Sequence, residues 1–176
     1  MVGVVSASNF GKCLDFVLQQ EGGWSDDPAD PGGATLNGIT LQTLRDYRGD
    51  QTASAADLRA MLPAERNAIY RACYWDMVRG DSLPAGADCM VFDFGVNAGP
   101  GRSAKMLQTA LGVTADGVIG PVTLAACSAA DPSDLIEKLR QARLIYYEGL
   151  PGWLEFGRGW AARVAACAEA AVGMVG

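Results

Sequence analysis

Apolar positions recur at helical spacing along most of this chain. The first such segment places Phe10, Cys13, Leu14, Val17 and Leu18 at intervals of three and four residues, the pattern of one buried helix face. Similar segments, each opened by a capping residue or a proline, predict further helices over residues 41–48, 55–62, 64–75, 87–96, 102–111, 122–129, 132–147 and 160–172. No strand-like alternation is sustained, so the chain is expected to be mainly α.

A short β-hairpin is the one extended element that the pattern supports. Leu36 and Ile39 flank the pair Asn37-Gly38, which favours a tight hairpin turn across Ala34–Thr40. The hairpin follows a loop rich in Gly, Asp and Pro, and this loop follows the first helix. The sequence therefore places a helix end, a polar loop and a hairpin in direct succession.

Glu21 lies at the end of that first helix. Asn9 or Ser8 can cap the start of the helix, and Gly22 can end it in the left-handed conformation. The last carbonyl groups of a helix carry partial negative charge, so a carboxylate is disfavoured there. A glutamate in this place, followed by a polar loop, is typical of a general acid.

Composition excludes several classes of reaction and of binding partner. The chain has 176 residues and no histidine, which excludes hydrolases with an imidazole base and the usual His-ligated zinc site. Glycoside cleavage is the remaining reaction class that is run mainly by carboxylates. A net charge of −6 argues against binding to nucleic acid. The five cysteines are dispersed and odd in number, which indicates buried free thiols in a reducing compartment.

The aspartates of the polar loop also raise the possibility of a calcium site. Aligning Asp26, Pro28 and Asp30 with the first ligands of a calcium loop puts Pro31 where glycine is required and Asn37 where a bidentate glutamate belongs. That interpretation fails at both positions. No metal and no organic cofactor is expected, and some of the aspartates are simply turn residues beside proline.

The spacing of Glu21, Asp30 and Thr35 resembles the Glu–Asp–Thr catalytic set of phage-type lysozymes, with an Asp-to-Thr gap one residue shorter. The whole segment EGGWSDDPADPGGATLNGIT, residues 21–40, resembles the signature of glycoside hydrolase family 108, which comprises phage endolysins and secretion-associated muramidases. Three later segments, DFGVNAG at 93–99, KMLQ at 105–108 and DGVIGPVT at 116–123, resemble the peptidoglycan-binding part found beside that catalytic part.

The resemblance covers about residues 8–170 and implies a mainly α, lysozyme-like fold with a small β-hairpin beside the active site. We expect a catalytic lobe at residues 1–90 and a helical peptidoglycan-binding lobe at 91–176, packed as one unit. The expected function is hydrolysis of the β-1,4 bond between N-acetylmuramic acid and N-acetylglucosamine. A lytic transglycosylase that uses Glu21 alone, and a non-catalytic wall-binding or secretion accessory protein, stay open as alternatives.

The resemblance implies an essential acid at the position of Glu21, but it does not settle the second catalytic group. Asp30, assisted by Thr35, is the candidate for positioning water or stabilising the transition state. Asn97, Tyr74 and Thr40 are the candidate substrate-binding residues.

Other residues are expected to be structural. Trp75 and Trp160, at helical spacing, are expected in the core. Asp93 lies within an apolar helix and is expected to be buried with partners.

The N-terminal segment has no basic region typical of a signal peptide, and the Ala-rich C-terminal segment is interrupted by Arg163 and Glu169. We therefore expect a monomer made in the cytoplasm, without stable membrane insertion. It would act on peptidoglycan in the periplasm after release by a holin or another membrane-permeabilising partner.

Overall fold

The computed structural model describes residues 8–25 and 33–175. The helices in these residues are α1 (Phe10–Gln20), α2 (Leu41–Arg48), α3 (Ala55–Arg59), α4 (Pro63–Tyr70), α5 (Ala87–Ala98), α6 (Pro100–Leu111), α7 (Pro121–Ala129), α8 (Pro132–Glu148) and α9 (Trp153–Val172). A π-helical turn η1 (Arg71–Trp75) and a 3-10 turn η2 (Gly80–Ser82) follow α4, and the strands are β1 (Trp24–Ser25), β2 (Thr35–Leu36) and β3 (Ile39–Thr40). The predicted mainly α fold class is confirmed.

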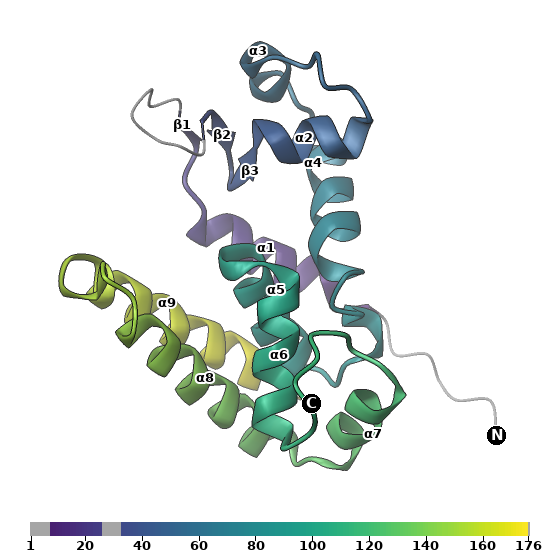
Figure 1. The fold of residues 1–176 in the computed structure, drawn as a ribbon, viewed down its shortest axis with the longest axis vertical. Helices are drawn as coiled ribbons and strands as arrows, with labels where there is room; N and C mark the ends of the chain where they lie inside the picture. The colour runs from purple at the N-terminus through teal and green to yellow at the C-terminus, as the bar shows by residue number, and fades with distance from the viewer. Residues whose placement is uncertain (1–7, 26–32, 176) are drawn as a thin grey trace.

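Helix α5 is the centre of the molecule. All its residues from Ala87 to Gly95 are buried, and it packs against α1, α6, α8 and α9 (Figure 1). Helices α8 and α9 form a hairpin that projects to one side, while the sheet with α2 and α3 lies at the other end of the molecule (Figure 1). The division at residue 90 falls within α5, and the two-lobe organisation stays a prediction.

The ends of α1 differ from the prediction. Glu21 is the C-terminal cap with extended backbone (φ −82°, ψ 143°), and its N–H bonds the carbonyl of Val17. Gly22 is not among the residues with positive φ, so the left-handed cap was wrong. Asn9 occupies the N-cap without a capping side-chain bond, because its amide donates to Asp88 of α5 at 3.0 Å. The hydroxyl of Ser8, the other predicted cap, accepts from the N–H of Phe10 at 3.3 Å.

The predicted hairpin is present and belongs to a three-stranded antiparallel sheet of order β1-β2-β3. Asn37 (φ 48°) and Gly38 (φ 77°) form its turn with both residues at positive φ, as a primed two-residue turn requires. β1 pairs Trp24 with Leu36 and Ser25 with Thr35. A two-residue strand is too short to show alternation, so β1 could not be recognised from the sequence.

Helix α9 begins at Trp153, although the prediction started it at Trp160. The predicted break over Gly149–Gly152 is present, with Gly149 as the C-cap of α8 and Gly152 as the N-cap of α9. Gly157 is buried, and a Cβ at this position would lie 2.6 Å from the ring of Trp153. The missing side chain makes room for an aromatic ring, so here glycine serves packing within a helix and does not end one.

The segment predicted as one helix over 64–75 divides into α4 and η1, and α3 ends at Arg59, short of the predicted Leu62. A π-helical turn widens the helix locally and is frequent at functional sites. Trp75 at its end is fully buried, as predicted.

Among the described residues no helix is long and apolar enough to cross a membrane.

Candidate active site

Glu21 lies where α1 passes into the sheet. Its side chain is 16% exposed, and its Oε1 accepts a hydrogen bond of 2.8 Å from Nη2 of Arg163 on α9. An acid held by a cation from the far end of the sequence has a fixed position. The arrangement joins the N-terminal helix to the C-terminal helix through one charged contact.

Arg163 belongs to a cluster of four ionisable side chains, whose other members are Glu21, Asp93 and Arg143. Its Nη2 also donates to Oδ1 of Asp93 at 2.6 Å, and Asp93 forms a second ion pair of 2.5 Å with Arg143 of α8. Asp93 and Arg143 are completely buried, as the prediction of a partnered Asp93 required. Asp93 thus lies between two guanidinium groups and is the shared partner of both. A buried ionic group of this kind is tolerated because each member is paired.

The surroundings keep Arg163 protonated. Burial alone lowers the pKa of Arg163, but its hydrogen bond to Asp93, the charge of Asp93 and the charge of Glu21 outweigh burial and raise that pKa above its ordinary value. Arg163 is therefore a permanent cation beside Glu21. It can stabilise the negative charge that the Glu21 side chain acquires when it gives up a proton.

The hairpin turn covers the other side of Glu21. A Cβ added to Gly38 would lie 2.5 Å from Oε2 of Glu21 and 3.2 Å from the hydroxyl of Tyr70. Tyr70, buried on α4, donates its hydroxyl proton to the carbonyl of Asn37 in the same turn. The turn therefore lies directly against the Glu21 carboxylate, and the hydrogen bond from Tyr70 of α4 holds it there.

Two tyrosine rings complete the wall beside Glu21. The rings of Tyr70 and Tyr74 lie 5.7 Å apart, and Tyr74 is half-buried on the π-helical turn η1. Burial, followed by the charge of Glu21, raises the pKa of Tyr70. Burial also raises the pKa of Tyr74, against a hydrogen bond with Thr43 that lowers it. Both phenols stay protonated and can act as hydrogen-bond donors.

The remaining predicted catalytic residues lie on or near the sheet. Thr35 on β2 pairs with Thr40 on β3 and with Ser25 on β1. Asp30 lies outside the described residues, in the segment that leaves the sheet at Ser25 and returns to it at Thr35. Thr40 uses its hydroxyl to cap α2, accepting from the N–H of Thr43 at 3.1 Å. The roles predicted for Asp30, Thr35 and Thr40 stay predictions.

Asn97 is connected to the charged cluster from the end of α5. Its side chain is exposed and donates to the carbonyl of Asp93 at 2.9 Å. The hydroxyl of Tyr147 donates to Oδ1 of Asn97 at 3.4 Å, and the Tyr147 ring lies 5.3 Å from that of Trp160. Trp160 packs against the core while part of it is exposed. An amide and an indole ring thus lie on the α8–α9 side of the site.

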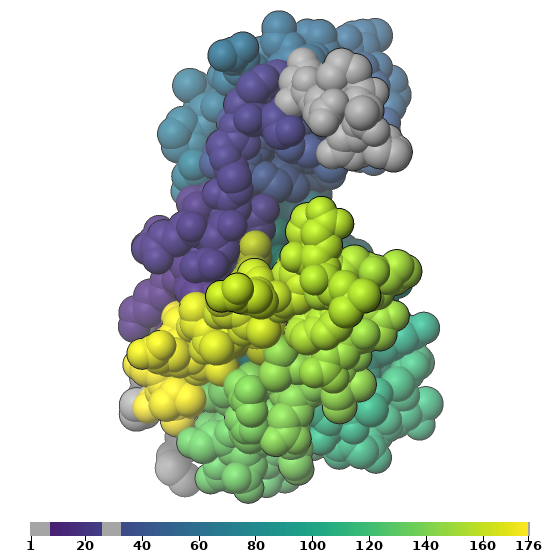
Figure 2. All heavy atoms as spheres, turned by 90° about the vertical axis from the view of Figure 1, so that its left-hand side faces the viewer, coloured from purple at the N-terminus to yellow at the C-terminus, as the bar shows by residue number. Residues whose placement is uncertain are grey.

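The molecule is hollowed between its two ends. Figure 2 shows a notch between the upper part, built from β1–β3 and α2–α4, and the projecting tip of the α8–α9 hairpin. Glu21 connects to the upper part through the hairpin turn and to α9 through Arg163, so it lies where these two parts diverge. Among the described residues no group of three His, Cys, Asp or Glu side chains is placed to hold a metal ion.

The sequence did not predict the contacts that Arg163, Arg143 and Tyr70 make at the site. One signal was available, because Asp93 sits in a very apolar helix and a buried carboxylate requires a cation. Arg163 is an isolated cation in an Ala-rich, otherwise apolar segment, which made it a suitable partner. No sequence pattern indicates the hydrogen bond between Tyr70 and Asn37, since this contact depends on how the hairpin turn packs.

The motif at residues 116–123 is held by one glutamine. Gln108 of α6 is 1% exposed, and its amide donates to Oδ1 of Asp116 at 2.6 Å and to the carbonyl of Val118 at 3.0 Å. Its oxygen accepts from the N–H of Gly117 at 2.8 Å. The polar groups of Gln108 and Asp116 are thus engaged in shaping the turn between α6 and α7.

Comparison with known proteins agrees with this architecture. The family model described as Glycosyl hydrolase 108 matches residues 14–99, and the model described as Predicted Peptidoglycan domain matches residues 102–165. Among the curated proteins none matches the chain. The solved structure of SagA from Brucella abortus is similar, with a TM-score of 0.87 and 42% sequence identity over 95% of each chain. The chain therefore belongs to the glycosyl hydrolase 108 family and carries a peptidoglycan domain, which makes it a glycoside hydrolase with peptidoglycan as its substrate or partner.

Proposed function

We propose that this protein is a muramidase, which hydrolyses the β-1,4 bond between N-acetylmuramic acid and N-acetylglucosamine with Glu21 as the general acid. The observation that carries the proposal is the setting of Glu21: a carboxylate that is 16% exposed, held by Arg163 and covered by the hairpin turn. It lies where the two ends of the molecule diverge around the notch. A glycan strand bound in that notch would pass the carboxylate.

In the proposed reaction Glu21 protonates the glycosidic oxygen as the bond to the anomeric carbon breaks. The carboxylate that this leaves is stabilised by Arg163, whose Nη2 is 2.8 Å from Oε1. Arg163 is itself held by its hydrogen bond of 2.6 Å to Asp93, so the cation is in position before the step. Asp30, assisted by Thr35, is the candidate to place water or to stabilise the oxocarbenium-like transition state.

Mass spectrometry of digested cell-wall sacculi tests the proposal. Hydrolysis gives fragments with a reducing-end muramic acid, a transglycosylase gives the anhydro form, and a wall-binding protein gives neither. We expect the reducing-end product from the wild type and a strongly reduced yield from Asp30→Asn. Anhydro products from the wild type, with Asp30→Asn fully active, would show that the reaction uses Glu21 alone and would contradict the proposed hydrolysis.

The hairpin turn offers a test of how closely Glu21 must be positioned. We expect Gly38→Ala to lower kcat/KM on sacculi by about 10-fold or more, because the new methyl group displaces the Glu21 carboxylate at its 2.5 Å contact. Gly49→Ala is the matched control. Gly49 also has positive φ (66°), but its Cβ would meet nothing within 4 Å.

Both alanine variants carry the backbone strain of a left-handed residue, about 1–2 kcal/mol. Thermal unfolding should therefore show similar losses of stability for the two proteins. Equal activity of Gly38→Ala and Gly49→Ala would contradict the close fit of the turn against Glu21.

The proposed biological setting is bacterial lysis or secretion. The protein would be made in the cytoplasm and would reach peptidoglycan in the periplasm through a holin or another permeabilising partner. Support for this comes from the five dispersed cysteines, an odd number that is typical of a reducing compartment. Cell lysis that requires artificial membrane permeabilisation would support the proposed route.

A further inference from the structure

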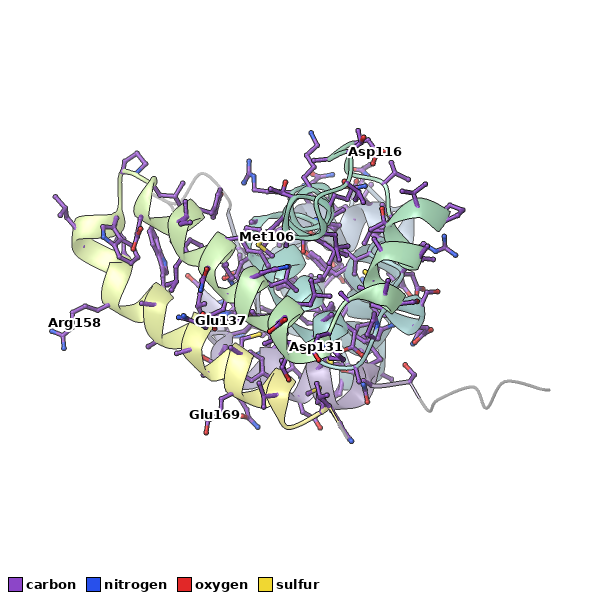
Figure 3. All side chains as sticks on the ribbon, turned by 90° about the horizontal axis from the view of Figure 1, so that it is seen from below. Met106, Asp116, Asp131, Glu137, Arg158 and Glu169 are labelled. Atoms are coloured by element: carbon purple, nitrogen blue, oxygen red, sulfur yellow. The ribbon has the colours of Figure 1, made fainter. Side chains whose placement is uncertain are left out.

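An apolar groove lies between α6 and α8, away from Glu21. It has a volume of about 370 Å³, and its lining residues include Phe94, Met106, Ala142, Ile145 and Tyr146. Met106 lies between the two helices in the view from below (Figure 3). Ile145 is 68% exposed, so an apolar side chain on the rim faces solvent. The volume is at the lower end of the range for small-ligand sites.

Two cationic side chains, Arg102 and Lys105, line one side of this groove. Arg102 and Lys105 are exposed and one helical turn apart on α6. Arg102 donates to the hydroxyl of Tyr146 at 2.8 Å, with its guanidinium 5.2 Å from the centre of that ring. Lys105 lies near the loop of Asp116, whose carboxylate already accepts from Gln108 and from the N–H of Val118. On a chain of net charge −6, this pair makes a local positive site.

The groove begins next to the candidate active site. Arg102 also donates to the carbonyl of Ala98 at 3.4 Å, one residue after Asn97. Tyr146 precedes Tyr147, whose hydroxyl bonds Asn97. The end of α5 therefore connects the two sites, with Asn97 between the charged cluster and the groove. A ligand passing Asn97 could extend along α6.

We propose that this groove binds the stem peptide of peptidoglycan, the short peptide that branches from each muramic acid. This inference rests on the proposed function. A stem peptide combines alanine methyl groups with free carboxylates. The methyl groups match the apolar floor, and the carboxylates match Arg102 and Lys105, of which Arg102 can bind a carboxylate through two parallel N–H groups. The glycan would lie in the notch and its peptide in the groove.

Two other anionic partners fit the surface less well. Nucleic acid is bound by extended basic surfaces, and the net charge of −6 opposes it. Anionic lipid surfaces attract clusters of about four to eight cations, and this rim has two. A narrow apolar groove with a pair of cations suits one short acidic peptide.

The test is an NMR titration with N-acetylmuramyl tripeptide, which has no glycosidic bond and reports binding without catalysis. We expect Arg102→Glu/Lys105→Glu to weaken its binding by about 10-fold or more, because each reversed charge repels the carboxylates. Lys12→Glu/Arg158→Glu is the matched control with the same change in net charge. Lys12 is exposed on α1, and Arg158 projects from the outer end of α9 (Figure 3).

A second readout separates this inference from the proposed function. Peptide-free glycan strands report cleavage alone, and the groove variant should cleave them at the wild-type rate while losing the preference for strands that carry peptides. Failure of the wild type to cleave any strand would refute the proposed hydrolysis. The tripeptide titration would then still decide whether the groove binds the stem peptide. Unchanged tripeptide binding by the groove variant, an equal loss in the control, or binding of phosphatidylglycerol vesicles without tripeptide binding would overturn the stem-peptide site.

Discussion

Replacing Glu21 with glutamine is expected to reduce the rate of sacculus cleavage by about 10²–10⁴-fold, the typical contribution of a general acid. The amide cannot deliver a proton to the glycosidic oxygen. It can still accept the hydrogen bond from Arg163, because its carbonyl oxygen can take the place of Oε1. The variant should therefore remain folded, with a circular dichroism spectrum and an unfolding midpoint close to those of the wild type.

Glu148 provides the matched control for this substitution. It is also a glutamate at the C-terminal end of a helix, α8, but its side chain is exposed. Glu148→Gln should leave turbidity clearing and product formation at wild-type levels. Near-normal clearing by folded Glu21→Gln would refute the assignment of Glu21 as the acid.

Replacing Asp93 with asparagine should lower the free energy of unfolding by about 3–5 kcal/mol. Asp93 is the shared partner of Arg143 and Arg163 and is completely buried. The substitution leaves the Arg143 guanidinium, also fully buried, without a compensating negative charge. Urea denaturation measures the loss, and the slope with denaturant should stay constant if both proteins unfold in two states.

Glu137→Gln is the control for the loss of an ordinary ion pair. Glu137 pairs with Arg140 on the surface of α8, and its side chain is 49% exposed. Exposed pairs contribute little, so its unfolding curve should nearly overlay that of the wild type. A stability loss for Asp93→Asn as small as that for Glu137→Gln would mean that the buried cluster does not hold α5, α8 and α9 together.

Glu21→Gln and Asp93→Asn should also differ in how they affect activity. Glu21→Gln removes the reacting group and leaves its setting intact. Asp93→Asn leaves the reacting group but frees Arg163, which positions it. The folded fraction of Asp93→Asn should therefore show a partial loss of activity. The cluster is thus a point where the stability of the fold and the geometry of the site depend on the same contacts.

Local chemistry made much of the fold predictable. Thr40 and Gly49 bound α2, Ser54 and Asp57 form the capping box of α3, and Asn37-Gly38 form the predicted hairpin turn. Each of these signals acts within a few residues, through a side chain that bonds a nearby N–H or a backbone that adopts positive φ. Such interactions do not depend on the rest of the molecule, so the sequence specifies them directly.

The errors arose where a distant contact competes with the local signal. The side chain of Asn9 bonds Asp88 across the molecule and does not cap α1, although its residue type favours capping. Spacing along the chain carries no information on this contact, since Asn9 and Asp88 are 79 positions apart.

The sequence by itself determined the mainly α class, the hairpin, the family resemblance and Glu21 as the candidate acid. It could not separate Glu21 from Glu148 by helix position alone, since both end a helix. Only the tertiary structure decided that difference, by bringing Arg163 from 142 positions away and the turn at Gly38 against the Glu21 carboxylate. The physical reason is that a charged group acquires its role from the charges and burial around it, and the packing of distant helices sets both.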